Sequence, residues 1–340
     1  MSEVEYPLQV LVSGKNVVQV PQLFRFVVKI SMSDFSDSFT MLIGARYAQT
    51  LGVFEPFGSV EVKYLGKTVF TGKIEKDETY EKENATYLEV AGRNLVSDFT
   101  EDDAPMNKYS KTTDNAVIKE MLGSDFEYDL DAAQKMDEWD IPAGTPRAQA
   151  AADAASKTGY QLWFSNGIVY KKKVSESIVF QKQYVTGESN QDGIHIMNNT
   201  LRVARDYQGV KSKIAVYASD KNHDAISRSV DILPVLKARS TEVPLTVNRT
   251  HRAHIPHKSK DEADKQLENI KASGQPIENV QFEVAGFDDI PINTPVKVIA
   301  PSQDVNGVFI VTDKTSTVEQ DFTIKTMLTM IPPGRRLSKK

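Results

Sequence analysis

The segment Val90-Ala91-Gly92-Arg93-Asn94-Leu95-Val96-Ser97-Asp98 ends a long stretch of β-patterned sequence. Apolar and polar residues alternate just before it, from Tyr87 to Val90, which predicts a half-buried strand. Gly92 permits a bend, or a close approach of another backbone that a side chain would block. We therefore expect Gly92, Arg93 and Asp98 to be packing and turn elements at the end of a first β-domain.

Short alternating segments fill the chain from residue 4 to residue 98. They cover Tyr6–Val12, Leu23–Ile30, Phe39–Ile43, Val60–Tyr64 and Val69–Ile74. Many short strands at such spacing indicate a barrel or a sandwich. Gly66-Lys67-Thr68 mimics the end of a phosphate-binding loop, but its strand–turn–strand context predicts a hairpin turn.

An α+β module is predicted for residues 99–176. It opens with an acidic linker, Glu101-Asp102-Asp103-Ala104-Pro105, where the composition changes. The expected elements are a helix capped by Thr113 and ending at Leu122, a helix over Arg147–Lys157 with Thr145 as N-cap and Pro146 in first position, and a hairpin that turns at Asn166-Gly167.

Residues 177–340 are predicted to form a second β-domain. Within it, residues 219–258 are expected to be polar and irregular, and Ser259-Lys-Asp-Glu262 predicts a helix that ends at Gly274. Strands resume at Val280. An echo links the two β-domains, because the distance from Val60 to Leu88 equals that from Val296 to Ile324. We expect residues 54–98 and 280–330 to share one strand order, although any two three-stranded meanders could match by chance.

Composition limits the function. The absence of cysteine in 340 residues excludes a disulfide scaffold, a zinc ribbon and a thiol nucleophile. No apolar run approaches the roughly 18–20 residues that span a bilayer. The acidic start, Met1-Ser2-Glu3-Val4-Glu5, is unlike a secretory signal, so neither secretion nor membrane embedding is expected. A net charge of −5 predicts no broad attraction for nucleic acid.

Two groups of residues are candidates for chemistry. His251, His254 and His257 are spaced three apart and would bind zinc or nickel if their loop curled around the ion. Pro256 prevents a regular helix there, which favours a solvated loop. Three acidic groups offer paired carboxylates for hydrolysis, but each lies beside a proline or in a turn: Glu101-Asp102-Asp103, Asp137-Glu138-Asp140 and Asp288-Asp289.

Taken in order, these features resemble the Mu-type baseplate hub proteins of contractile-tailed bacteriophages (the tail hub or late control protein D-like superfamily). The similarity includes the first β-domain that ends at Gly92-Arg93, the helix that starts at Thr145-Pro146, the Asn166-Gly167 hairpin, the Arg202–Tyr217 strand pair, and the final strands up to Pro332. The chain lacks the lysozyme-like or metallopeptidase-like insert of longer hubs. That absence puts a cell-wall-cleaving role of this polypeptide in doubt.

The resemblance implies a mainly β fold with an α+β insertion, in which two similar β-barrel-like domains flank a small α/β module. It implies a homotrimeric, pseudo-six-fold ring in the virion baseplate, assembled in the host cytoplasm without a cofactor. Its partners would be the tail tube or tube initiator, the central spike, the tape measure protein and the baseplate wedge, with no specific nucleic-acid binding. Two alternatives stay open: a metal-dependent or carbohydrate-binding β-protein that uses the histidines, and a six-fold tube or adaptor protein.

Overall fold

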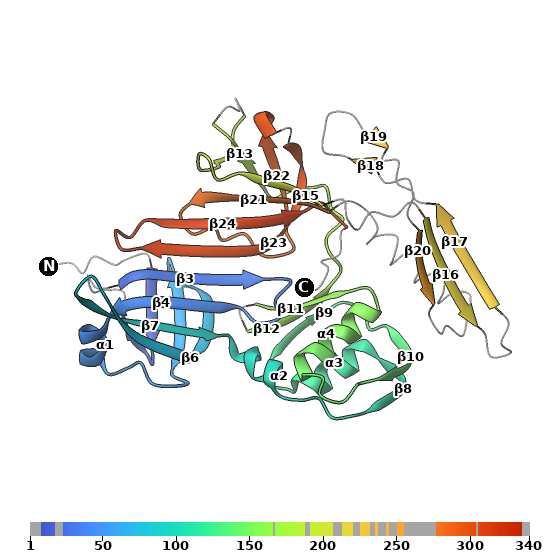
Figure 1. Ribbon diagram of the computed structural model, residues 1–340, viewed down its shortest axis with the longest axis horizontal. Helices are drawn as coiled ribbons and strands as arrows, with labels where there is room; N and C mark the ends of the chain where they lie inside the picture. The colour runs from blue at the N-terminus through green and yellow to red at the C-terminus, as the bar shows by residue number, and fades with distance from the viewer. Residues whose placement is uncertain are drawn as a thin grey trace. The chain divides into compact units, whose positions relative to one another are not determined.

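The computed structural model describes residues 8–17, 23–165, 167–187, 191–206, 213–219, 225–231, 235–236, 243–244, 250–254, 277–303 and 305–334. The fold is mainly β, as predicted (Figure 1). The chain groups into two compact units: unit 1 comprises Met1–Lys173, Glu283–Asn293 and Thr312–Leu328, and unit 2 comprises Val174–Phe282, Thr294–Val311 and Thr329–Lys340. The division at residues 98 and 176 stays a prediction.

The first β-series belongs to unit 1. Its elements are β1 (Leu8–Val12), β2 (Lys15–Asn16), β3 (Leu23–Ser31), β4 (Ser38–Gly44), α1 (Ala45–Leu51), β5 (Ser59–Tyr64), β6 (Lys67–Lys82) and β7 (Ala85–Arg93). The strand order is β3-β4-β7-β6-β5-β1-β2. Alternate residues of β1 and β4 are buried, as their apolar–polar alternation predicted.

Aromatic rings fill the core of this series. The ring of Phe39 lies 6.4 Å from that of Phe26 and 5.6 Å from that of Phe70, and all three side chains are buried. At Leu65 and Gly66 the chain makes a turn with positive φ at both residues, which joins β5 to β6. The hairpin interpretation of Gly66-Lys67-Thr68 is therefore confirmed.

The α+β segment of unit 1 follows β7. Its elements are η1 (Leu95–Ser97), α2 (Asp98–Glu101), β8 (Lys108–Thr113), α3 (Asp114–Leu122), β9 (Glu127–Leu130), β10 (Lys135–Asp140), α4 (Arg147–Lys157), β11 (Gln161–Ser165) and β12 (Ile168–Lys172). Both predicted helices are present, and α3 and α4 pack together (Figure 1). The short helix α2 ends at Glu101, the first residue of the expected acidic linker Glu101–Pro105.

The two helix starts differ from one another. The Thr113 side chain accepts a hydrogen bond from the Ala116 N–H at 3.3 Å, so the predicted cap of α3 is confirmed. The prediction for α4 was wrong by one position, since Pro146 is the N-cap and Arg147 the first helical residue. The Thr145 hydroxyl donates instead to the Pro142 carbonyl at 2.8 Å, which ties it to the preceding turn.

A second β-series begins in unit 2. Its strands are β13 (Lys182–Val185), β14 (Ile194–His195), β15 (Arg202–Asp206), β21 (Ile277–Ala285), β22 (Pro295–Ala300), β23 (Val305–Glu319) and β24 (Ile324–Ile331), with η2 (Pro301–Gln303) between β22 and β23. Strands β21, β23 and β24 contribute residues to both units.

The second series repeats the strand order of the first. The order β15-β21-β24-β23-β22 matches β3-β4-β7-β6-β5 strand for strand. The echo at Val60 and Val296 therefore predicted a common strand order correctly. The match ends at the next position, because β1 is antiparallel to β5 whereas β13 is parallel to β22.

Between β15 and β21 the structure describes five further strands. They are β16 (Lys213–Ser219), β17 (Ala225–Asp231), β18 (Val235–Leu236), β19 (Val243–Pro244) and β20 (Thr250–His254). Four of them lie in residues 219–258, so the expectation of an irregular segment was wrong: β16 pairs with β17 and β20, and β18 with β19. The helix predicted from Ser259 lies outside the described residues.

A buried ion pair sits in the core of the α+β segment. Lys171 Nζ lies 2.9 Å from Asp114 Oδ2, and neither side chain has any exposed surface. Asp114 also accepts bonds from the Thr158 hydroxyl at 2.7 Å and the Gln134 N–H at 2.8 Å. Lys171 Nζ donates to the Ala132 carbonyl at 3.1 Å. Because both charges have hydrogen-bond partners, the pair fixes the arrangement of four segments.

Replacement of Lys171 tests this pair. We expect Lys171→Met to lower the free energy of unfolding by about 3–5 kcal/mol, because it leaves the Asp114 carboxylate buried without its cation. The neighbouring Lys172 pairs with Asp129 at 2.5 Å but is 28% exposed, so Lys172→Met should cost less than about 1 kcal/mol. Urea unfolding of both variants measures the difference. Equal losses would show that the buried pair has no special weight.

Candidate functional site: the Gly92–Arg93 cluster

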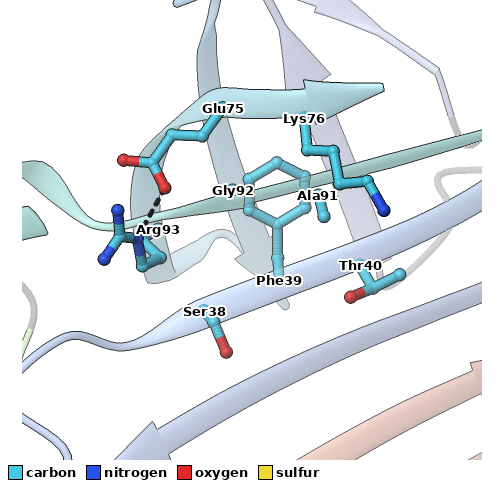
Figure 2. A pocket seen from close by; sticks show the side chains of 8 residues that line it. All are labelled: Ser38, Phe39, Thr40, Glu75, Lys76, Ala91, Gly92 and Arg93. Atoms are coloured by element: carbon cyan, nitrogen blue, oxygen red, sulfur yellow. Dashed lines mark hydrogen bonds and ion pairs between the residues drawn. The ribbon is translucent and has the colours of Figure 1, made fainter. Parts of the chain in front are cut away.

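Gly92 lies where β7 comes unusually close to β6. A Cβ atom at this position would lie 1.9 Å from the Lys73 carbonyl oxygen and 2.7 Å from the Phe39 ring. Gly72 on β6 is equally tight, with its Cβ position 2.3 Å from the Arg93 carbonyl oxygen. Figure 2 shows the Phe39 ring beside Gly92. Two roles were expected of Gly92, a bend and a close approach of another backbone. The structure shows the close approach.

Arg93 is the centre of a polar cluster. Its Nε donates to Glu75 at 2.6 Å, and its two terminal nitrogens donate to Thr100 at 3.1 Å and to Glu101 at 2.6 Å (Figure 2 draws the Glu75 bond). The other Glu75 oxygen accepts the Ser97 hydroxyl at 2.7 Å. The hydrogen bond that Arg93 donates to the Glu75 carboxylate raises the pKa of Arg93 above its usual value.

This cluster links the first β-series to the segment that follows it. Ser97 belongs to η1 and Glu101 to α2, so Arg93 and Glu75 hold both short helices against the middle of β6 and the end of β7. Asp98 adds an ion pair with Lys73 of β6. Both carboxylate oxygens of Glu75 already accept hydrogen bonds from the chain. The cluster is therefore suited to fixing the path of the chain from β7 into η1 and α2.

An open groove of about 200 Å³ lies beside the cluster. It is lined by Ser38, Phe39, Thr40, Glu75, Lys76, Ala91, Gly92 and Arg93.

The remaining site residues from the sequence are dispersed. Gly167 has a φ of +84° beside the Ser165–Ile168 pair, while Asn166 lies outside the described residues. His251 and His254 belong to β20, with only their backbone described, and His257 lies outside the described residues. The metal prediction therefore stays untested.

Three carboxylates of the acidic groups have partners within the fold, and Asp137, Glu138 and Asp140 lie on strand β10. Glu101 is engaged by Arg93, and Asp102 by Arg147 at 3.1 Å. Asp288 is buried and accepts the Ile290 N–H at 2.9 Å. In the described part of the chain, no group of three or more metal-ligating side chains is found. Within the same residues, no helix has both the length and the apolar composition for a membrane crossing.

Sequence reasoning missed a buried carboxyl group at the turn between β3 and β4. Asp37 is 3% exposed, and its Oδ1 accepts the Ser31 N–H at 3.2 Å. Burial raises the pKa of Asp37 to about 8, against the opposing effects of the Ser31 bond, Asn94 and Lys314. Lys314 Nζ is itself held by the carbonyls of Asp288 and Ile290 at 3.1 and 3.2 Å. No local motif marks this residue, since its neighbours Asn94 and Lys314 are distant in the sequence.

Comparison with known proteins identifies the fold. No protein-family model matches the chain, and no curated protein matches it in sequence. Solved structures do match over almost its whole length. A tail protein from Neisseria meningitidis MC58 has a TM-score of 0.77 at 17% identity, covering 96% of both chains. The 43 kDa tail protein of prophage MuSo2 from Shewanella oneidensis has a TM-score of 0.74 at 14% identity, covering 96% of this chain and 98% of its own.

A third match comes from a secretion system. An Escherichia coli component of the type VI secretion system, structurally similar to bacteriophage T4 tail proteins, has a TM-score of 0.57 at 11% identity, covering 97% of this chain and 79% of its own. At such identities the likeness shows the fold alone. The chain has the fold of phage tail proteins, and the fold implied by the resemblance to Mu-type hubs is confirmed.

A substitution at Gly92 tests the close approach of β6 and β7. We expect Gly92→Ala to lower the free energy of unfolding by about 1–3 kcal/mol, since the methyl group would force the two backbones apart. Gly187 has open space around its Cβ position, so Gly187→Ala should change it by less than about 0.5 kcal/mol. Thermal or urea unfolding measures both. An unchanged Gly92→Ala protein would contradict the steric account.

Asp37 predicts a pH dependence of stability. Its carboxyl keeps a proton in the folded chain up to about pH 8, whereas the ordinary value is 3.8. Between these two pH values the folded state keeps a proton that the unfolded state has lost. The free energy of unfolding therefore falls as the pH rises from 3.8 to about 8. Asp37→Asn should make the unfolding free energy depend less on pH, with a change in slope of at most about 1.4 kcal/mol per pH unit. Asp103→Asn, at an exposed acid, is the control. Parallel curves for wild type and Asp37→Asn would contradict it.

Proposed function

We propose that this chain is a structural hub protein of a contractile-tail baseplate, or of a related injection machine. In this proposal three copies close into a pseudo-six-fold ring that joins a hexameric tube to a trimeric spike. The observation that carries it is the repeated strand order within one chain. Two like β-series per chain give six quasi-equivalent positions when three chains close.

The fold likeness to phage tail and type VI secretion proteins supports this role. The net charge of −5 suits a conduit that DNA or a tape measure protein crosses without sticking. The partners in this arrangement are the tube or its initiator, the spike, the tape measure and the baseplate wedge. Residues 99–175 lie outside the channel in this proposal, because they form an insertion that has no counterpart in the strand repeat.

The ring size is testable on the purified chain. Native mass spectrometry should give a smallest closed species of about 114 kDa, three times the chain mass of 37.9 kDa. Electron microscopy of particles that contain the chain should then show it with three-fold symmetry. A closed ring of six copies would replace the hub by the tube or adaptor alternative.

A further inference from the structure

Phe57 combines two unfavourable features on the surface of unit 1. Its side chain is 72% exposed, so the ring contributes little to the core. Its φ angle is +62°, a left-handed conformation that is rare for a bulky residue. Such a conformation is strained and persists only where the surrounding structure enforces it. Neither burial nor backbone preference therefore explains a phenylalanine at this position.

The surrounding turn holds Phe57 rigidly. Glu55-Pro56-Phe57-Gly58 closes with a hydrogen bond from the Gly58 N–H to the Glu55 carbonyl at 2.9 Å. Proline in second position and a positive φ in third position are features of a type II turn, whose third residue is normally glycine or asparagine. The Phe57 N–H also donates to the Ile74 carbonyl of β6 at 2.9 Å, which fixes the turn to the sheet.

Phe54, three residues earlier in the same loop, has the ordinary role of an aromatic ring. Its side chain packs against the buried core of the first β-series, as does that of Val53. The loop thus has its core contacts without Phe57. A singly exposed apolar residue needs no explanation by itself. The strain at Phe57 does, because strained residues concentrate at functional sites.

Charged groups surround the Phe57 ring. Lys73 Nζ lies 5.5 Å from the ring centroid and forms an ion pair with Asp98. The Lys73 side chain is 14% exposed, whereas that of Asp98 is 66% exposed. Glu55, in the same turn as the ring, is exposed as well. The surface next to the ring therefore presents carboxylates to the solvent.

The Arg93 cluster extends this acidic surface. Arg93 faces Lys73 across β6 and β7, and it pairs with Glu75 and Glu101. An acidic rim around an aromatic ring complements a basic rim around an apolar pocket. The two cations, Lys73 and Arg93, leave a net charge of −2 when they are set against four carboxylates, those of Glu55, Glu75, Asp98 and Glu101.

We propose that Phe57 is a preformed anchor for a different protein, one that offers an apolar pocket for the ring with lysine or arginine at the pocket's rim. Aromatic side chains seated in pockets carry much of the binding energy of protein interfaces. A ring that is already held rigidly loses little conformational entropy on binding.

The charge of the chain argues against a second copy as the partner. A net charge of −5 makes a basic surface of another protein the better complement to this acidic rim. The inference rests on the proposed function for the source of that protein, which would be another component of the tail particle.

Unfolding of the isolated chain tests whether the ring serves the fold. Asparagine tolerates a positive φ, so Phe57→Asn removes the ring and relieves the strain together. We expect its urea midpoint to equal or exceed that of the wild type. Phe54→Ala is the matched control and should lower the midpoint, because the Phe54 ring packs against the core. A lower midpoint for Phe57→Asn would show that the ring supports the fold, and would overturn the inference.

Incorporation into tail particles tests the binding. Wild type and variant are co-expressed in cells that produce the particles, and mass spectrometry compares their ratio in purified particles with that in the cell extract. Phe57→Asn should be depleted from the particles by roughly tenfold, as expected when an interface anchor is removed.

Leu65→Asn is the matched control for incorporation. Leu65 is 68% exposed with a φ of +49°, so its replacement also removes an exposed apolar side chain and relieves strain. It follows the last residue of β5, whereas Phe57 precedes the first, so Leu65→Asn should keep the input ratio. Equal depletion of both variants would overturn the assignment of the anchor to Phe57.

A charge reversal tests the acidic rim. Glu55→Lys should also be depleted from the particles, since it places a cation opposite the partner's basic rim. Glu83→Lys makes the same change at an exposed acid in the turn between β6 and β7, and it should keep the input ratio. Equal depletion of the two lysine variants would contradict a basic partner.

The outcomes separate this inference from the proposed function. Absence of the wild-type chain from the particles would refute the hub proposal, and the particle partner with it. Particles that contain the wild type, and Phe57→Asn at the input ratio, would overturn the anchor alone.

Discussion

The pairing of β3 with β23 is the contact on which unit 1 depends. It joins residues 25–31 to residues 313–319, nearly the whole chain apart. Phe26, Val28 and Val318 bury their side chains at this junction, and burial of such a side chain is worth about 1.5–3 kcal/mol. The first β-series is therefore completed only when the last part of the chain is present. Such non-local pairing is slow to form, because the loop-closure entropy precedes the gain from the contacts.

Turn and cap chemistry explain which elements the sequence predicted. Thr113 and the helix over residues 147–157 follow local rules, and so does the turn at Leu65-Gly66. The equal spacing of apolar strands in the two halves could also be predicted, because it is counted along the sequence and requires no knowledge of contacts between the halves. α1 was missed, since Gly44 at its start makes no side-chain cap hydrogen bond that a cap rule would recognise.

The polar residues of the interior were beyond sequence reasoning. Asp114 and Lys171 are 57 positions apart, and each looks like an ordinary surface residue in its own segment. The burial of Asp37 could not be predicted either, because its neighbours Asn94 and Lys314 meet it only in the folded chain. By contrast, Gly92 and Arg93 stood out because a glycine next to a strand end permits a bend or a close approach of another backbone. The partners of Arg93 could not be predicted, because Glu75 lies at the bulge in β6 and Glu101 lies in the short helix α2.

The internal repeat shows which part of the strand arrangement the two β-series share and where they differ. Five strands keep one order in both series, so this order belongs to the repeated unit. At the far end of the long hairpin the two series differ, because residues 313–319 of β23 pair with β3, whereas most residues from Lys76 to Lys82 of β6 are exposed. An uncovered edge with apolar residues would pair with any strand it met. Lys76, Asp77, Glu78 and Glu81 place charged side chains along this stretch of β6, and charge on a strand edge disfavours indiscriminate pairing.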